Sequence, residues 1–182
     1  MKKAYLFFVI FLCLAAEASP SGLFTFRNKY YFSDILGTDL LLESPLKYFR
    51  LGADIKYMVN YEDELPYQYL SGAVYQKWGK QVFFFSIGAG VSYAYNEILR
   101  YASGYLYLDM ALPRFVKAIP LGFQMDMQVF SDSMNLFPDL FFQFDVFNDL
   151  KINMGSSSLL ILDYSDKPVF RTGVYWGIAY AF

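Results

Sequence analysis

Histidine is absent from this 182-residue chain, and cysteine occurs once, as Cys13. Without histidine, the chain lacks the commonest general base and the commonest metal ligand of proteins. A single cysteine excludes an internal disulfide framework and zinc sites built from several thiolates. We therefore predict that the chain is not an enzyme, binds no metal and needs no cofactor.

Charged residues and long apolar runs are also scarce. The 15 basic and 17 acidic side chains give a net charge of −2, and no basic block could neutralise a row of phosphates. A nucleic-acid partner is therefore not expected. After residue 18, no apolar run reaches the ~20 residues that a membrane-spanning helix needs, which argues against a helical membrane protein.

The first eighteen residues have the pattern of an export signal. Two lysines lie near the start, and residues 4–16 form an unbroken apolar run. Small residues follow where a signal peptidase reads the chain. We predict a signal peptide over 1–18 and one exported domain over 19–182. Ala16 and Ala18 are the small residues that the peptidase would read, and cleavage before Ser19 would release the domain through the general secretory pathway.

Aromatic residues make up 21% of the chain and recur at alternate positions. Alternation with a period of two is typical of β-strands. The segments 47–61, 81–95 and 150–163 are long enough to provide the ~9–11 residues of a tilted membrane strand, whereas soluble strands have a mode of ~5–6. This favours a membrane barrel whose aromatic face contacts lipid. A secreted, soluble β-sandwich binding protein is the alternative.

The last segment of the chain has the most specific pattern. Its alternate residues are Val174, Trp176, Ile178, Tyr180 and Phe182. This pattern resembles the C-terminal assembly signal of bacterial outer-membrane β-barrel proteins, a class whose small members include the OmpA membrane domain, OmpX and OmpW. The resemblance implies a Gram-negative outer membrane, contact with lipid and lipopolysaccharide, and recognition by the outer-membrane assembly machinery and periplasmic chaperones. It identifies no surface partner.

The number of strands is ambiguous because nine segments alternate, and single-chain barrels normally use an even number. Treating 148–168 as a loop gives eight strands. We therefore predict an all-β fold, a closed antiparallel up-and-down transmembrane β-barrel of eight strands. The alternative admits a strand through 39–43 and has ten. In that case the turns at 79–80 and 148–149 lie at one end, and the acidic segment 62–64 is extracellular rather than periplasmic.

Charged residues occur on the polar face of several predicted strands, the face that would point into the barrel. The interior of an eight-stranded barrel is just wide enough for side chains to fill, and buried charges have to be paired. We predict an interior charge network formed by Arg27, Lys29, Arg50, Asp54, Lys56, Asp109, Asp126, Asp145 and Arg171. Such a filled barrel would have a structural or surface-interaction role.

A pore is the second interpretation of the same polar face. A narrow porin-like channel, or a hydrophobic-ligand channel of the OmpW type, would be lined by Gly88, Gly90, Ser92, Tyr105, Tyr107 and Tyr175. Catalysis is not expected, because the serines near Asp132 belong to a predicted turn and those at 156–158 to a predicted flexible connection.

Overall fold

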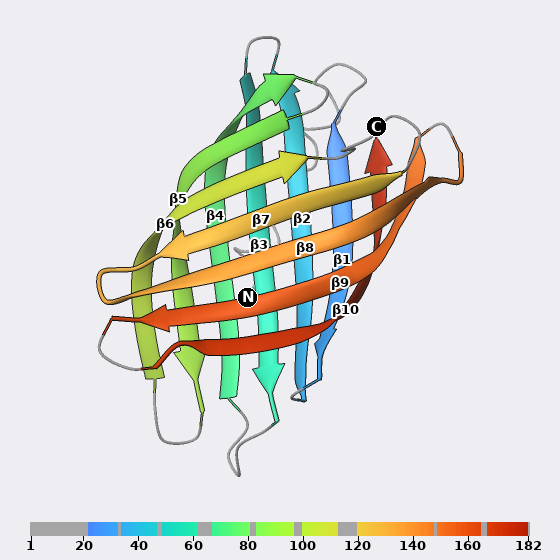
Figure 1. Cartoon of the computed structure of the whole chain (residues 1–182). Coiled ribbons are helices and arrows are strands. Elements are labelled where there is room, and N and C mark those ends of the chain that lie inside the picture. The colour runs from blue at the N-terminus through green and yellow to red at the C-terminus, as the bar shows by residue number, and fades with distance from the viewer. Residues whose placement is uncertain are drawn as a thin grey trace, which may run out of the picture.

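Ten antiparallel strands form one closed barrel, in which the order of strands follows the order of the chain (Figure 1). The computed structural model describes residues 22–32, 34–46, 49–61, 67–80, 83–96, 100–112, 120–147, 149–164 and 167–181. The strands are β1 (Leu23–Tyr31), β2 (Ile35–Leu46), β3 (Phe49–Asn60), β4 (Tyr67–Lys80), β5 (Phe83–Tyr95), β6 (Arg100–Leu112), β7 (Leu121–Val129), β8 (Ser133–Asp145), β9 (Leu150–Asp163) and β10 (Val169–Ala181).

The predicted all-β, antiparallel, up-and-down barrel is confirmed, and its single closed sheet is not the two-sheet sandwich of the alternative. The barrel closes where β1 pairs with β10, with Leu23 opposite Ala181. The predicted signal peptide over 1–18 and its cleavage site lie outside the described residues. None of the described residues forms a helix long and apolar enough to cross a bilayer.

The predicted count of eight strands is wrong, and the alternative of ten is correct. The segment taken as a loop contains β9, and its three serines lie within the strand rather than in a flexible connection. The segment 150–163 does alternate in the sequence, so the error arose from the choice of which segment to omit to reach an even number of strands. β2 is also a full strand of 12 residues. Its three successive leucines hide the alternation in the sequence, so the sequence suggests only a short strand or a loop there.

The hairpin between β7 and β8 contains the predicted turn at Ser131 and Asp132. The amide of Phe130 donates to the carbonyl of Ser133 across 2.9 Å. β8 begins at Ser133, and Pro138 lies inside it. Proline lacks a backbone donor, which weakens a strand signal in the sequence. Here the rest of the barrel maintains the strand on both sides of Pro138.

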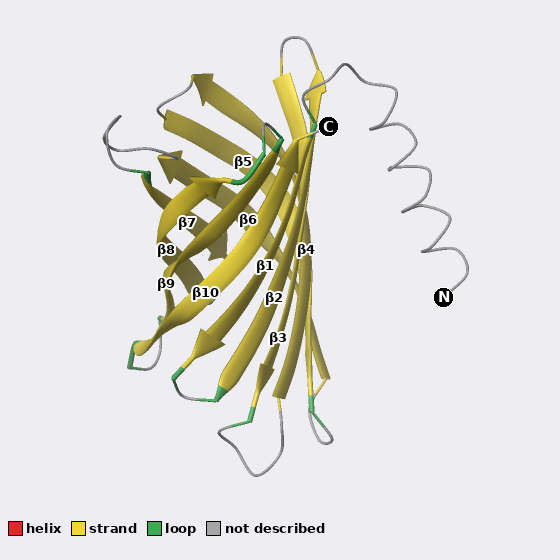
Figure 2. Cartoon of the chain, turned by 90° about the vertical axis from the view of Figure 1, so that its right-hand side faces the viewer, coloured by secondary structure: helices red, strands yellow, loops and turns green. Residues whose placement is uncertain are grey.

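Two ends of the barrel can be distinguished. We use "terminal end" for the end at which β1 begins and β10 finishes, and "distal end" for the opposite one. Figure 2 shows the terminal end uppermost, beside the C mark. β4 ends and β5 begins at the terminal end, and so do β8 and β9, as the ten-strand alternative predicts. The segment 62–64 lies outside the described residues.

The strands are steeply tilted, so those at the front of Figure 1, β7 to β10, cross those behind at a large angle. Tilt and stagger are what close a sheet into a barrel. Successive side chains alternate between the outer and inner faces, as in any strand. In β10, for example, Val174 and Trp176 are half exposed, whereas Tyr175 between them is 4% exposed.

Tyrosines gather on the outer face toward the distal end, where Tyr30, Tyr57, Tyr93 and Tyr101 are exposed. Toward the terminal end the exposed aromatics are mainly phenylalanine and tryptophan, among them Trp78, Phe83, Phe85, Phe142 and Phe144. Aliphatic side chains lie between them. Aromatic residues at both edges of an apolar band are typical of transmembrane barrels.

Glycine is required where strands or rings come too close for a side chain. A Cβ added at Gly173 would lie 2.0 Å from the carbonyl oxygen of Tyr30 on β1. A Cβ at Gly52 would lie 2.1 Å from the ring of Tyr75, which fills the space above it. Gly79 ends β4 with φ +138°, a conformation that favours glycine. The inner face is therefore packed with rings that rest on glycines.

Candidate functional site

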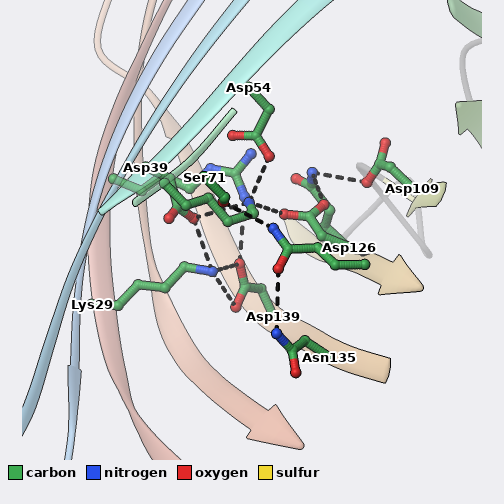
Figure 3. Close-up of polar contacts among 12 residues, drawn as sticks. Lys29, Asp39, Asp54, Ser71, Asp109, Asp126, Asn135 and Asp139 are labelled. Carbon is green, nitrogen blue, oxygen red and sulfur yellow. Dashed lines mark hydrogen bonds and ion pairs between the residues drawn. The ribbon is translucent and has the colours of Figure 1, made fainter. Parts of the chain in front are cut away.

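A network of buried charges crosses the middle of the barrel (Figure 3). Asp139 on β8 is one centre of it, and it is fully buried. Its carboxylate accepts from Lys29 Nζ at 2.9 Å, from Ser157 Oγ at 2.6 Å and from Arg27 Nη1 at 3.4 Å. Tyr31 Oη lies 3.2 Å from the same serine hydroxyl. Three strands, β1, β8 and β9, are thus brought together at one carboxylate.

Lys56 on β3 is the second centre. Its Nζ lies 2.7 Å from Asp126 Oδ2, 2.7 Å from Asp54 Oδ2 and 3.7 Å from Asp39 Oδ2. Asp39 also pairs with Lys29 at 3.1 Å, and so it joins the two centres. The ring of Phe137, which is 1% exposed, lies beneath both lysines, 5.8 Å from Lys29 Nζ and 5.5 Å from Lys56 Nζ.

Neutral polar groups extend the network on β5 to β7. Asp109 and Asp126 lie directly opposite each other on β6 and β7. The amide of Gln124 donates to both carboxylates, at 3.0 Å and 2.9 Å, and Ser86 Oγ donates to Asp109 at 3.2 Å. Gln128 is fully buried and donates to Ser71 Oγ at 3.0 Å. The donors allow two adjacent carboxylates to remain inside the barrel.

A separate ion pair lies nearer the terminal end. Lys77 Nζ on β4 is 2.5 Å from Glu43 Oε1 on β2, and Tyr75 Oη donates to the same oxygen at 3.2 Å. The ammonium group of Lys77 also lies 4.9 Å from the centre of the Phe84 ring. Glu43 is 4% exposed, so its charge depends on these two donors.

The structure brings six of the nine predicted network residues together inside the barrel: Arg27, Lys29, Asp54, Lys56, Asp109 and Asp126. Asp145 is different, since its side chain is 52% exposed at the terminal rim, 3.9 Å from Lys151 Nζ. Arg171 lies near the distal end of β10, where Nη1 donates to the carbonyl of Phe170. The side chain of Arg50 lies outside the described part of the structure.

Sequence reasoning missed four charged residues inside the barrel: Asp39 and Asp139 of the network, and Glu43 and Lys77 of the separate ion pair. Asp39 and Glu43 belong to β2, which was expected to be a loop or a short strand. Lys77 belongs to a segment that alternates poorly. Asp139 lies six residues before Asp145, so both lie on the same face of the strand. Extending the predicted strand toward the N-terminus would have placed Asp139 in the interior. The missed residues are mostly acidic, so carboxylates outnumber cations among the described buried residues, whereas the nine predicted residues comprise five cations and four carboxylates.

The outward residues of β10 are arranged as the assembly-signal pattern requires. Val174, Trp176, Ile178 and Tyr180 are all exposed on the outer face, and the ring of Trp176 packs edge-on against Phe26 of β1. Phe182 lies outside the described residues. Because β10 pairs with β1 in the finished barrel, its edge is covered there.

The network separates two cavities. The cavity at the terminal end has a volume of about 330 Å³ and is lined by charged and polar residues that include Arg27, Lys77, Gln124, Gln143 and Lys151. The cavity at the distal end has a volume of about 260 Å³, and its walls are more apolar, with Ile35, Met58, Phe130, Leu159 and Ile161 among them.

The residues expected to line a pore fill space instead. Tyr107 is fully buried and stacks on Tyr75, with ring centroids 5.1 Å apart. Tyr105 and Tyr175 are 6% and 4% exposed. A Cβ at Gly90 would lie 2.4 Å from the Tyr105 ring. Within the described residues, no three side chains of the Asp, Glu, Cys and His types are grouped to hold a metal ion.

Three solved structures are similar to this chain. The anion-selective porin from Comamonas acidovorans has a TM-score of 0.42 and 12% identity over 86% of this chain, which spans only 59% of the porin. The N-terminal β-barrel domain of Pseudomonas aeruginosa OprF has a TM-score of 0.39 and 14% identity, over 91% of this chain and 100% of that domain. Neisserial surface protein A has a TM-score of 0.39 and 9% identity, over 89% of this chain and 95% of its own. No protein-family model matches the sequence, and no curated protein matches it either.

Proposed function

We propose that this chain is an integral outer-membrane β-barrel protein whose interior is closed by side chains, and that it has a structural or surface-interaction role rather than a conducting one. The observation that carries the proposal is the contrast between the two faces of the wall. Apolar side chains are exposed outside, and paired charges are buried inside.

The outer face supports the membrane part of the proposal. Val91 and Val74, at the middle of β5 and β4, are 70% and 64% exposed, and aliphatic residues of other strands surround the barrel at the same level. Soluble monomers rarely expose a contiguous apolar patch beyond a few hundred Å². A continuous apolar band is stable where lipid takes the place of water. Strands of 9 to 14 residues are long enough for a tilted crossing.

The inner face supports the closed part of the proposal. Lys56, Asp126, Phe137 and Tyr31 come from four different strands, and each is at most 2% exposed. Ions would have to pass through this layer to travel from one cavity to the other. Because Lys29 and Lys56 are each paired with buried carboxylates, displacing either of them costs about 3–5 kcal/mol.

Location and partners follow from the same proposal. A signal peptide would direct the chain through the general secretory pathway, and periplasmic chaperones and the outer-membrane assembly machinery would then receive it. The exposed alternate residues of β10 support recognition by that machinery. In the membrane, the distal tyrosines would lie at the lipopolysaccharide leaflet, because barrels of this kind keep their termini in the periplasm.

Conductance across a planar lipid bilayer tests the closed interior. We expect no steady current from the purified full-length protein. Phe137→Ala removes the ring beneath the two lysines and should produce small, discrete openings. Phe142→Ala is the matched control, because it removes the same ring from the outer face of the same strand and should remain silent. A steady ohmic current through the unmodified protein would contradict a closed barrel.

Cell fractionation tests the membrane part separately. We expect the full-length protein to fractionate with the outer membrane and to migrate faster on a detergent gel before boiling than after it. A protein that is recovered in the soluble fraction without any amphiphile would contradict the location, whatever its conductance.

A second candidate function is binding of a hydrophobic ligand at the distal end. The observation that favours it is the apolar lining of the distal cavity, with polar Asn60, Asn135 and Ser133 at its margin. A fluorescent fatty acid would test it. Leu159→Asp should abolish binding if the cavity is the site, whereas Leu140→Ala, on the outer face, should leave it unchanged.

A further inference from the structure

We propose that the terminal-end cavity is a binding site for a small organic carboxylate, with Arg27 as its anchoring residue. The ligand would carry one negative charge and a compact apolar part of a few carbons. The site is separate from the closed interior on which the proposed function depends, and it requires no passage through the barrel.

Arg27 supplies the main argument. It is 5% exposed, and it lines the cavity from β1. Its guanidinium group has five N–H donors, which match the two oxygens of a carboxylate. The hydrogen bond from Nη1 to Asp139, at 3.4 Å, is long. Asp139 is held more closely by Lys29 and Ser157, at 2.9 Å and 2.6 Å. Arg27 is therefore a deeply placed cation whose hydrogen-bonding capacity is largely unused by Asp139.

The other charged residues of the cavity also favour an anion. Lys77 and Lys151 line it with Arg27, whereas among the described lining residues Glu43 is the one carboxylate. Glu43 is already neutralised by Lys77 at 2.5 Å. Lys151 is only 3.9 Å from Asp145, and its side chain is 38% exposed at the rim. The lining thus has two cations whose ion pairs are long, one deep and one at the mouth.

The remaining walls define the ligand class. Gln124, Gln143 and Asn153 offer neutral hydrogen-bonding groups, and Leu41, Phe84 and Phe141 offer apolar contacts. A phosphate or a polyanion would use the charges but not the apolar walls, and it would be repelled by Glu43 and by the carboxylates beyond Arg27. A volume of about 330 Å³ suits a molecule of about ten non-hydrogen atoms, since one water occupies ~30 Å³ in the liquid.

Fluorine NMR on the full-length protein in detergent micelles tests the site. The probe is 4-fluorobenzoate, and its neutral isostere 4-fluorobenzamide controls for partition into the micelle. We expect saturable broadening of the benzoate signal and at least ~10-fold weaker binding of the amide, because charge-assisted hydrogen bonds to the carboxylate are lost.

Variants of the residues that line each cavity locate the site. Gln143→Glu places a negative charge in the lining and should weaken benzoate binding by ~10-fold or more. Asn135→Asp is the matched control, because it adds the same charge to the distal cavity, and it should leave binding unchanged. Lys151→Gln should weaken binding ~2–5-fold, as expected for an exposed charge. Arg27→Lys keeps the charge but loses the planar fork, and should weaken binding further than Lys151→Gln does.

Equal behaviour of the two probes would overturn the proposal, as would an equal loss of affinity in Gln143→Glu and Asn135→Asp. The measurement is made in micelles on the folded barrel, so a failure here leaves the conductance and fractionation results unaffected.

Discussion

The two faces of β8 differ completely although their residues alternate along one strand. On the inner face, Phe137 and Asp139 are 1% and 0% exposed. On the outer face, Leu140 and Phe142 are 44% and 47% exposed. Phenylalanine occurs on both faces, so residue type alone does not decide which face is buried. What differs is the partner, because inner groups contact one another and outer groups contact the surroundings.

This comparison indicates the environment to which each face is suited. The inner face buries charges and satisfies them in pairs, as a low-dielectric interior requires. The outer face leaves apolar groups unpaired, which is favourable only where the surroundings are apolar as well. Removing a charge should therefore destabilise the inner face, whereas adding a charge should destabilise the outer face.

The largest effect is expected from removing one inner charge. Asp139→Asn leaves Lys29 and Arg27 without their shared carboxylate and should lower the free energy of unfolding by ~3–5 kcal/mol. Urea unfolding in lipid vesicles would measure it. Asp145→Asn, at the exposed rim, is the control and should cost less than ~1 kcal/mol. Similar losses in both variants would mean that the interior network contributes no more than a surface ion pair.

The next effect is expected from adding a charge to each face. Val91→Arg on the outer face should cost ~2–4 kcal/mol in a bilayer. Gln124→Arg on the inner face should cost clearly less, because Asp109 and Asp126 are already within hydrogen-bond distance of that side chain. The same unfolding assay compares them. If Val91→Arg were neutral in lipid vesicles, the outer face would not be facing lipid.

A smaller effect is expected from adding one methyl group to each face. Gly173→Ala on the inner face forces a Cβ against the Tyr30 carbonyl and should cost ~1–3 kcal/mol, as overpacking usually does. Gly104→Ala on the outer face has its nearest neighbour 3.9 Å away and should be neutral or slightly stabilising. Thermal unfolding, followed by gel mobility, would show the difference. Equal melting temperatures would argue against the close approach of β10 to β1.

The smallest effect is expected from removing one hydroxyl from each face. Tyr31→Phe breaks a buried contact with Ser157 and should cost about 1 kcal/mol. Tyr57→Phe breaks the exposed hydrogen bond to Gln68 and should cost only about 0.3 kcal/mol, since water or lipid headgroups can replace that bond. Parallel urea titrations would resolve the two. A greater loss in Tyr57→Phe would reverse the assignment of buried and exposed hydroxyls.

The alternation was predictable from sequence because a period of two is fixed by strand geometry. It places Lys29, Lys56 and Asp126 on the polar face of their strands, and in the structure all three side chains are buried. The segment 150–163, which forms β9, alternates as well, and the error there came from treating it as a loop to reach an even number of strands. Alternation failed for β2, where three successive leucines are apolar on both faces. In the structure β2 is held by its pairing with β1 and β3.

The contacts of the network were not predictable in the same way. Parity places a residue inside but does not say which residue it meets, since that depends on strand number and stagger. With eight strands instead of ten, Asp139 and Lys29 would face each other across a narrower barrel at a different level. The role of Asp139 as a shared acceptor therefore required the strand count first.

The pairing of β1 with β10 has a consequence for how the protein is made. Each of these two strands has an unsatisfied hydrogen-bonding edge until the other arrives, and they are almost the entire chain apart. An incomplete polypeptide emerging from the ribosome thus has no way to shield its first edge, and open edges invite aggregation. Contacts so distant in sequence also form slowly. The protein should therefore be most prone to aggregation before β1 pairs with β10, and much less so once the barrel has closed.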